Sequence, residues 1–282
     1  MVVFPNAKIN LGLNIIRKRA DGYHDLETSF YPIGIRDALE ILPIDDPNED
    51  TTGVTLISTG IPVDGEAEKN ICTKAWHLIR KDFPHLPPIH LHLHKAIPTG
   101  AGLGGGSADG AFTLRSLNSL FMLGIDDHTL AKYALELGSD CPFFLLNLPC
   151  FASGRGEKMT TSGLDLSDYS LLVIHPGIHV STAEAFRGVQ PSMPARHIPD
   201  ILSMPLEQWR ETLVNDFERT VFPQFPEIET IRDLLYDAGA LYSSMSGSGS
   251  SVFGIFQKHA IPEISFPEHY IVHRQESLKP AY

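Results

Sequence analysis

The chain has 282 residues, of which 43% are hydrophobic and 20% are charged, and its formal net charge is -12. This length and composition are typical of a globular protein that buries a sizeable core and can divide into two domains. The acidic balance disfavours partners that carry phosphate backbones or anionic headgroups. We therefore expect no nucleic-acid or membrane partner, and nothing in the sequence indicates an obligate protein partner.

The three cysteines, Cys72, Cys141 and Cys150, are an odd number at no metal-ligand spacing. This pattern favours reduced thiols, which are typical of the cytoplasm. The first residues have neither a basic start nor a long apolar segment, and no run approaches the roughly 20 apolar residues of a membrane span. We expect a cytoplasmic protein.

The first predicted strand separates apolar from polar residues. Over residues 7–15, apolar side chains occupy every second position, which places them on one face of a strand. The other face carries Lys8, Asn10, Gly12 and Asn14. That face is either solvated or functional, and the strand alone does not decide between the two. Asp21-Gly22 predicts a turn, and residues 23–30 predict the strand that pairs back.

Three further segments precede the centre of the chain. Residues 45–53 are acidic and are expected to form a solvated loop without chemistry. Residues 70–81 have helical periodicity and lead to Pro84 as a stop. The strand predicted at 89–94 carries three same-face histidines, which could bind zinc. No acid or cysteine pattern completes such a site, so a polar or packed strand face is the favoured interpretation.

A glycine-rich segment follows this strand. Residues 97–107 read Ile-Pro-Thr-Gly-Ala-Gly-Leu-Gly-Gly-Gly-Ser, and apolar residues at helical spacing follow over 111–121. Ser107 is expected to cap the start of this helix. A glycine loop between a strand and a helix N-terminus is typical of an anion site, because the loop amides and the positive end of the helix dipole converge there. Phosphate is the expected ligand.

Three kinds of phosphate loop can be distinguished. A Walker A loop requires Gly-Lys-Ser/Thr at its end, and no lysine is present here. Three of the glycines satisfy the dinucleotide pattern, but that fold continues with a strand ending in an acid. Here a helix is predicted instead, with Asp127 as its cap and Gly138 as its stop. The Pro-x-Gly-x-Gly-Leu-Gly-Gly-Gly-Ser loop of the GHMP kinases matches residues 98–107.

Two further segments carry candidate chemistry. Asp140 precedes Cys141 and Pro142, so it is expected at the N-cap of a helix, a position compatible with either a structural or a catalytic carboxylate. Residues 245–251 form a second loop of glycine and serine, between a helix predicted over 226–239 and a strand over 252–256. Two such loops indicate one site approached from two domains, although a plain turn remains an alternative for the second loop.

Taken together, these segments resemble the GHMP kinases. The resemblance rests on residues 7–11, 21–24, 98–107, 137–144, 154–157, 175–177, 215–218 and 245–249. It implies an α+β fold of two domains, with the active site in the cleft between an N-terminal nucleotide-binding domain (1–157) and a smaller C-terminal domain (158–282). Within the family, Asp-Gly-Tyr-His and Gly-Ser-Asp-Cys-Pro-Phe-Phe are similar to the kinases that act on 4-diphosphocytidyl-2-C-methyl-D-erythritol.

The resemblance implies transfer of the γ-phosphate of ATP to the 2-hydroxyl of that substrate, in the non-mevalonate isoprenoid pathway. Lys8 and Asp140 are the implied catalytic residues. ATP binding is implied for Asn70, Ile71, Lys74, Pro98, Thr99, Gly100, Ala101, Gly102, Leu103, Gly104, Gly105, Gly106, Ser107 and Ala108. Substrate binding is implied for Asn10, Tyr23, His24, Thr182, Phe186, Gly247, Ser248 and Gly249.

Mg²⁺ is expected to accompany ATP, with Ser107 as the one candidate ligand. The family usually has a second serine where this chain has Ala108, and we expect fewer polar contacts there with activity intact. Two alternatives stay open. One is another small-molecule kinase of this family, acting on homoserine, mevalonate or a sugar, and the other is a noncatalytic nucleotide sensor with the same fold.

Overall fold

The computed structural model describes residues 1–44, 53–63 and 65–278. Apart from Gly53, the acidic segment expected to be a solvated loop lies outside the described residues. The described chain divides into two compact units. The first comprises Met1–Ala7, Ile35–Thr99 and Gly104–Asn147, and the second comprises Lys8–Gly34, Gly100–Leu103 and Leu148–Tyr282. A single domain boundary at 157/158 stays a prediction.

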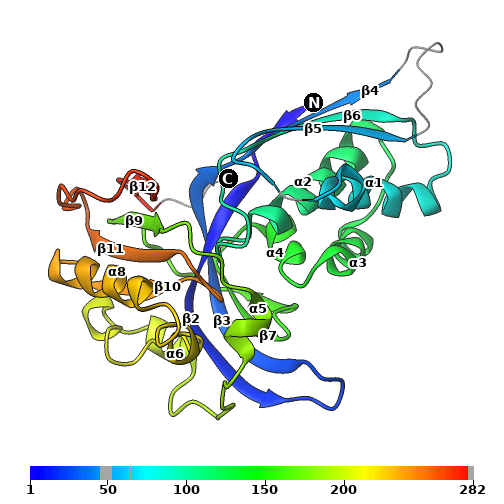
Figure 1. Ribbon diagram of the computed structural model, residues 1–282. Helices are drawn as coiled ribbons and strands as arrows, with labels where there is room; N and C mark the ends of the chain where they lie inside the picture. The colour runs from blue at the N-terminus through cyan, green and yellow to red at the C-terminus, as the bar shows by residue number, and fades with distance from the viewer. Residues whose placement is uncertain (45–52, 64, 279–282) are drawn as a thin grey trace. The chain divides into compact units, whose positions relative to one another are not determined.

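The first unit combines a four-stranded sheet with helices. The sheet has the order β1 (Val2–Val3), β4 (Ala38–Pro43), β6 (Ile89–Lys95), β5 (Val54–Gly60). Its helical elements are η1 (Ala67–Lys69), α1 (Ile71–Asp82), α2 (Gly105–Leu120), α3 (Asp127–Leu137) and α4 (Cys141–Leu146). Figure 1 shows these helices on one face of this sheet.

The strand β6 shows why the helices gather on that face. Ile89, Leu91 and Leu93 are buried, whereas His92 and His94 alternate with them and are exposed. The prediction of a half-buried strand is therefore confirmed. The hydroxyl of Thr59 lies 3.1 Å from His92 Nε2 and 3.0 Å from His94 Nδ1. Among the described residues, no group of three or more histidine, cysteine, aspartate or glutamate side chains is placed to hold a metal ion.

The second unit contains two further four-stranded sheets. One has the order β2 (Asn6–Lys18), β3 (His24–Arg36), β7 (Cys150–Gly154), β8 (Lys158–Thr161). The other has the order β10 (Tyr242–Met245), β11 (Val252–Gln257), β9 (Tyr169–His175), β12 (Ile271–Gln275). The helical elements of this unit are α5 (Thr182–Phe186), α6 (Ile198–Leu202), η2 (Leu206–Gln208), α7 (Glu218–Val221) and α8 (Pro226–Asp237).

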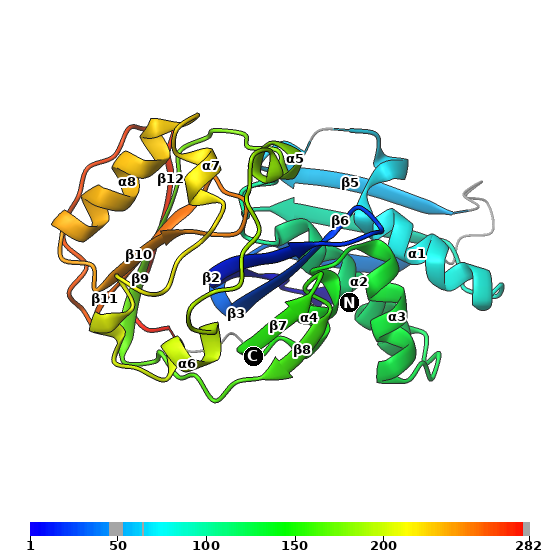
Figure 2. The ribbon, with the colours of Figure 1, turned by 90° about the horizontal axis from the view of Figure 1, so that it is seen from below.

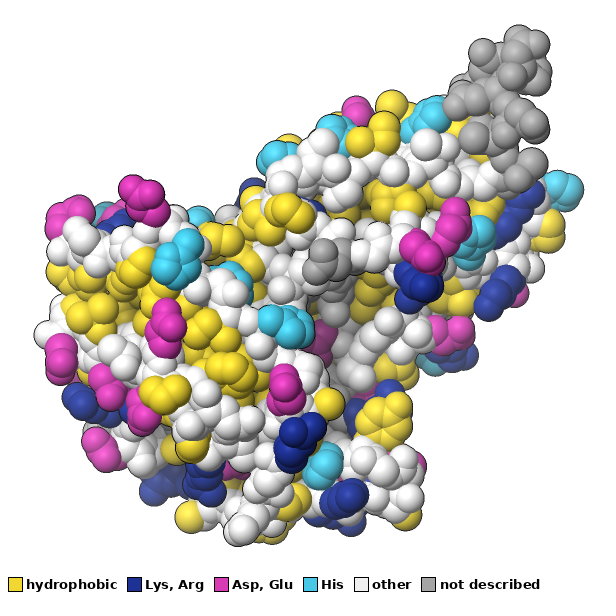
Figure 3. Space-filling view, viewed as in Figure 1, with side chains coloured by type: hydrophobic (Ala, Val, Ile, Leu, Met, Phe, Trp, Pro, Cys, Tyr) yellow, Lys and Arg dark blue, Asp and Glu magenta, His cyan; other side chains and the backbone are white. Residues whose placement is uncertain are grey.

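The core of the second unit lies between α8 and the sheet that contains β9 and β11. Ile228, Ile231 and Leu235 of α8 pack with Leu172 and Ile174 of β9 in one buried cluster. Figure 2 shows α8 running alongside these strands. On the face shown in Figure 3, the described basic side chains are scattered among acidic ones. No continuous basic patch forms on this part of the described surface, in keeping with the acidic composition.

The polar face of β2 is buried. Lys8 and Asn10 are each 3% exposed, and Asn14 is 5% exposed. The alternative of a solvated outer face is therefore wrong, because both faces of this strand are covered by the rest of the fold. A lysine is rarely buried without polar partners, so this face requires an explanation in terms of its contacts.

Candidate functional site

The glycine loop leads into α2, but Ser107 does not cap this helix. The N-cap is Gly104, whose φ of 72° lies in the left-handed region, and α2 begins at Gly105. The predicted cap was wrong because glycine permits the helix to start three residues earlier than a hydroxyl cap would set it. A similar shift occurs at α3, where Asp126 is the cap and accepts a hydrogen bond from Thr129, in place of the predicted Asp127.

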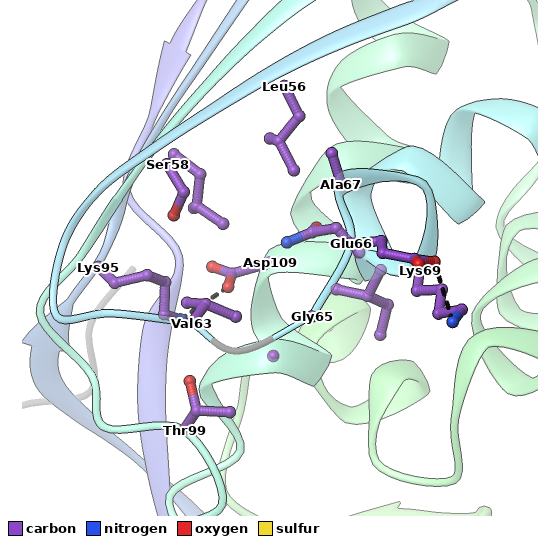
Figure 4. A pocket seen from close by; sticks show the side chains of 14 residues that line it. Leu56, Ser58, Val63, Gly65, Glu66, Ala67, Lys69, Lys95, Thr99 and Asp109 are labelled. Atoms are coloured by element: carbon purple, nitrogen blue, oxygen red, sulfur yellow. Dashed lines mark hydrogen bonds and ion pairs between the residues drawn. The ribbon is translucent and has the colours of Figure 1, made fainter.

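A pocket of about 290 Å³ in the first unit brings together several of the residues implied in ATP binding. Asn70, Ile71, Thr99 and Gly106 all line it, and Figure 4 shows Thr99 among the labelled residues of the pocket. Asn70 also caps α1, because its side chain accepts a hydrogen bond of 2.9 Å from Cys72 N. Lys74 is exposed and is not among the residues that line the pocket.

The pocket is lined by both apolar and charged side chains. The apolar side chains are Leu56, Val63, Ala67, Ile71 and Leu93. Its charged residues are Lys95 and Asp109, which form an ion pair of 2.7 Å, and Glu66 and Lys69, which form another of 2.9 Å. Ala108, which precedes Asp109 in the sequence, is fully buried. A serine at that position would also be buried, so its absence removes no exposed hydroxyl.

Lys95 joins two carboxylates. Its ammonium group donates to Asp37 and to Asp109, and all three side chains are at least 97% buried. Asp37 also accepts hydrogen bonds from the backbone nitrogens of Ala96 at 2.6 Å and Ile97 at 2.8 Å. Burial raises the pKa of Asp109 to about 7, although the neighbouring Lys95 opposes this shift. This triad ties the start of the glycine loop to the helix that follows it.

Lys8 lies in the second unit, on the buried face of β2. Its ammonium group donates to the Asn10 side chain and, at 3.0 Å, to the carbonyl oxygen of Gly102. The Asn10 amide in turn donates to Thr28 at 2.9 Å. These contacts orient the lysine and offset part of the cost of burying its charge. Asn10, implied in substrate binding, therefore holds Lys8 directly.

The two glycine loops are in contact within the second unit. The hydroxyl of Ser246 donates to Gly102 O at 2.8 Å, and the backbone nitrogen of Ser251 donates to Ala101 O at 3.1 Å. A Cβ placed on Gly102 would lie 1.9 Å from Ser246 O. Only glycine allows this approach. That the two loops form one binding site stays a prediction.

Asn215 holds the second glycine loop by hydrogen bonds, and Gly247 of this loop lies close to Asn10. The side chain of Asn215 donates to Met245 O and to Gly247 O, each at 2.8 Å. A Cβ on Gly247 would lie 3.3 Å from Asn10 Oδ1. Gly247 and Gly249 are buried, and Ser248 is half-buried. Asn215 therefore positions the second glycine loop.

The three aromatic residues implied in substrate binding, Tyr23, His24 and Phe186, lie in the second unit. The His24 and Phe186 rings are stacked with centroids 4.7 Å apart. The guanidinium of Arg155 lies over the Tyr23 ring at 4.3 Å. Desolvation, with a smaller contribution from Lys18, lowers the pKa of His24, so its imidazole is neutral at pH 7. Thr182 is exposed and begins α5, the short helix that ends at Phe186.

Asp140 occupies the N-cap of α4, as predicted from the sequence. Its φ and ψ are −88° and −13°, and its side chain makes no capping hydrogen bond. The carboxylate is therefore not needed to cap the helix. The next residue, Cys141, is fully buried, its thiol is hydrogen-bonded to Ser107, and burial raises its pKa to about 12.

The described donor set fits a magnesium ion that arrives with a nucleotide. Mg²⁺ keeps several waters and takes only one or two protein oxygens in addition to substrate phosphates. It does not need the cluster of three ligating side chains that is lacking among the described residues. Ser107, in the first turn of α2, supplies one hydroxyl of the required kind.

Sequence reasoning missed several residues of these sites. Lys95 contacts Asp37, 58 residues away in the sequence, and Asp109, 14 residues away. Arg155, in the turn that follows β7, lies over the Tyr23 ring. Their only signal in the sequence was a charged residue beside a recognised motif. Sequence periodicity does not report such long-range pairing.

Among the helices that the structure describes, none is long and apolar enough to cross a membrane.

Comparison with known proteins identifies the family. The sequence profile described as GHMP kinases N terminal domain matches residues 70–147, and the one described as GHMP kinases C terminal matches residues 199–265. A 4-diphosphocytidyl-2-C-methyl-D-erythritol kinase of Parabacteroides distasonis is 51% identical over 258 residues, which are 92% of each chain. One of Bacteroides thetaiotaomicron is 49% identical over 268 residues, which are 95% of each chain.

Solved structures agree with this assignment. A crystal structure of a 4-(cytidine 5'-diphospho)-2C-methyl-D-erythritol kinase has 32% identity and a TM-score of 0.74, with 90% of each chain covered. The mevalonate kinase of Methanococcus jannaschii, at 14% identity and a TM-score of 0.71 over 98% of each chain, shares the fold. The chain therefore belongs to the GHMP kinases, and within them to the family of 4-diphosphocytidyl-2-C-methyl-D-erythritol kinases.

Proposed function

We propose that this kinase transfers the γ-phosphate of ATP to the 2-hydroxyl of 4-diphosphocytidyl-2-C-methyl-D-erythritol, a step of the non-mevalonate isoprenoid pathway. The observations that carry this substrate assignment are two ring contacts, the stacking of His24 on Phe186 and the guanidinium of Arg155 over Tyr23. These rings suit a pyrimidine, and the guanidinium suits a diphosphate. The names of the relatives support the same substrate.

The cytosine of the substrate would stack on Tyr23 and Phe186. The neutral imidazole of His24, which lies on Phe186, would turn a nitrogen to the edge of the base. Thr182, Asn10 and the second glycine loop (Gly247, Ser248 and Gly249) complete the proposed contacts to the substrate. An aromatic face and one hydrogen-bonding edge distinguish a cytidyl substrate from mevalonate, homoserine or a sugar, none of which carries a base.

Lys8 and Asp140 would perform the chemistry. Phosphoryl transfer has a loose transition state, so positioning and charge stabilisation contribute most of the catalysis. Asp140 would orient the hydroxyl group or accept its proton, and Lys8 would stabilise the negative charge that develops on its oxygen. The hydrogen bonds from Lys8 to Asn10 and Gly102 O support this role, because they fix the direction of the ammonium group.

ATP would occupy the pocket of the first unit and the glycine loop. Asn70 and Ile71, with Lys74 on the outer side of α1, would contact the base end, and residues 98–108 would enclose the phosphates. Mg²⁺, when bound, would neutralise phosphate charge, with Ser107 as its protein ligand. The three buried, free cysteines support a reducing compartment such as the cytoplasm.

A direct assay tests the proposal. Purified protein is incubated with ATP, Mg²⁺ and either the cytidyl substrate, mevalonate, homoserine or galactose, and the phosphorylated product is followed by mass spectrometry. We expect phosphorylation of the cytidyl substrate alone, at its 2-hydroxyl. Turnover of one of the other alcohols, with none of the cytidyl substrate, would refute the assignment.

A further inference from the structure

Thr28 of β3 has a buried hydroxyl next to the polar face of β2. Its side chain is 1% exposed, and β2 and β3 are neighbours in one sheet (Figure 2). The hydroxyl makes two hydrogen bonds, one as donor and one as acceptor. It donates to Gly12 O at 2.6 Å and accepts from the Asn10 side-chain amide at 2.9 Å. Thr28 therefore links the backbone of β2 to the side chain that holds Lys8.

The two hydrogen bonds of this hydroxyl are not interchangeable. A hydroxyl has one hydrogen to donate, and the carbonyl oxygen of Gly12 is only an acceptor. The hydrogen of the Thr28 hydroxyl is therefore committed to Gly12 O, and the hydroxyl oxygen serves Asn10 as an acceptor. Within the Asn10 amide, the nitrogen is the donor and the oxygen is an acceptor. The nitrogen must consequently face Thr28, and the amide oxygen must point the other way.

The other end of the Asn10 amide faces Lys8. An ammonium group has three hydrogens and no acceptor, so it requires the amide oxygen. That oxygen accepts the hydrogen bond from Lys8 Nζ. If the amide were reversed, two donors would meet at Lys8 and two acceptors would meet at Thr28. All three side chains are buried, where an unmade hydrogen bond is costly. These groups therefore have a single consistent arrangement.

The backbone of Asn10 is fixed by a different contact, which does not set the amide orientation. The backbone nitrogen of Asn10 donates to Ser246 Oγ at 3.2 Å. The same hydroxyl donates to Gly102 O at 2.8 Å, and this carbonyl accepts from Lys8 at 3.0 Å. Ser246 thus places one acceptor of Lys8 directly. The other acceptor, Asn10 Oδ1, depends on which way the amide is turned, and Thr28 distinguishes the two orientations.

We propose that Thr28 is a positioning residue for phosphoryl transfer, whose hydroxyl sets the orientation of the Asn10 amide and thereby the direction of the Lys8 ammonium group. This inference rests on the proposed function, in which Lys8 stabilises the negative charge that develops on the acceptor oxygen. Thr28 acts through Asn10 and needs no contact of its own with either substrate. Because positioning contributes most of the catalysis in this reaction class, loss of the hydroxyl lowers the rate of the chemical step.

The test removes the hydroxyl in two ways and retains it in a third variant. Thr28→Val has nearly the shape of threonine without the hydroxyl, Thr28→Ala also lacks it, and Thr28→Ser keeps it. In the first two variants we expect kcat for the cytidyl substrate to fall about 10- to 100-fold, with KM for ATP unchanged. Thr28→Ser should retain most of the wild-type kcat. Equal kcat in the wild type and Thr28→Val would overturn the proposal.

Ser29→Ala is the matched control. Ser29 is the next residue of β3, is fully buried, and donates its hydroxyl hydrogen to Cys150 O at 3.2 Å. Its side chain lies on the opposite face of the strand from Thr28. Denaturant unfolding should show lower stability in both Ser29→Ala and Thr28→Val, whereas kcat should fall only in Thr28→Val.

Two results of this comparison would contradict the proposal. Equal losses of kcat in Ser29→Ala and Thr28→Val would indicate a general effect of strand stability and would overturn it. A failure of both Thr28→Val and Thr28→Ala to fold would make the hydroxyl a structural group, which would also overturn it. Folded variants with a loss of kcat that Thr28→Ser does not share would support it.

A double-mutant cycle tests whether Thr28 acts through Asn10. In Asn10→Ala there is no amide to orient, so adding Thr28→Val should lower kcat no further in that background. If the double variant instead shows the product of the two single losses, Thr28 and Asn10 act independently and the proposal is overturned.

Turnover by the wild type separates this inference from the proposed function. If the wild type and Thr28→Val phosphorylate the cytidyl substrate with the same kcat, the inference fails and the proposed function stands. If the wild type phosphorylates mevalonate, homoserine or galactose instead, the proposed function fails, and the ratio of the two kcat values for that alcohol still tests Thr28. If the wild type phosphorylates none of these alcohols, both fail.

Discussion

Replacing Gly102 with alanine tests the contact between the two glycine loops. The new Cβ would lie 1.9 Å from Ser246 O and 2.9 Å from its carbonyl carbon, at a φ of +76°. Left-handed backbone costs an alanine roughly 1–2 kcal/mol, and relief of the overlap adds about 1–3 kcal/mol of packing strain. We therefore expect the free energy of unfolding to fall by about 2–5 kcal/mol.

The same substitution should lower activity more than stability requires. Gly102 O accepts hydrogen bonds from Lys8 Nζ and Ser246 Oγ, so a shift of this carbonyl moves the lysine. A misplacement of about 1 Å can reduce the rate roughly 100-fold, and we expect a loss of that order in kcat/KM. Denaturant unfolding and steady-state kinetics measure the two effects separately.

Gly239→Ala is the matched control. Its φ of +96° is also left-handed, but a Cβ there meets nothing within 4 Å. This variant should lose only the backbone term of roughly 1–2 kcal/mol and should keep its kcat/KM. The reasoning is refuted if Gly102→Ala is no less stable than Gly239→Ala and retains activity within about twofold.

Three further predictions concern single side chains. Asp140→Asn should reduce kcat about 10²- to 10⁴-fold while the protein stays folded, because the amide has nearly the size and shape of the carboxyl group; an unchanged kcat would contradict the proposed role. Asn215→Ala removes the hydrogen bonds to Met245 O and Gly247 O and should destabilise the protein by about 2–4 kcal/mol in denaturant unfolding, whereas a change below about 0.5 kcal/mol would show that the second loop is held by other contacts. The hydrogen bond to Glu27 raises the pKa of His197 above 6.5, so its stabilisation is complete below pH 6.5 and is lost as pH rises through the higher folded value. Thermal unfolding followed from pH 6.5 upward should show this loss in the wild type and not in His197→Gln.

Local features of the fold were predictable from the sequence. Strand β6 and helix α1 were predicted because alternation and helical periodicity depend on neighbouring residues only. The N-cap residue of α2 was not predictable from the sequence. A glycine in the left-handed region and a serine are both acceptable starts to the same helix, and the choice of Gly104 is decided by how the preceding loop approaches the helix.

The candidate site was predictable where one motif is continuous in the sequence. Residues 98–107 predict a phosphate loop because its glycines are adjacent in the sequence, and this role stays a prediction. The burial of Lys8 was not predictable from β2, because periodicity reports that two faces differ without reporting what covers the polar face. The covering contacts come from Gly102 and from Ser246, which is 236 residues from Asn10.

The burial of the triad of Asp37, Lys95 and Asp109 was likewise not predictable from the sequence. Each residue, taken alone, is most simply interpreted as a solvated side chain, because charged residues are rarely buried. Burial becomes acceptable only when all three meet, since Lys95 balances one carboxylate and its hydrogen bonds hold the other. No single position of the sequence contains that information.

Three glycines of the glycine loop have different structural roles. Gly104 supplies a left-handed cap to α2, and Gly102 allows Ser246 O to approach where any Cβ would clash. Gly106 needs neither, because it lies within the helix and a Cβ there would meet open space. Packing and backbone geometry therefore explain the first two glycines and leave the third unexplained by the fold. The open space beside Gly106 belongs to the pocket that Asp109 also lines, which we propose as the ATP site.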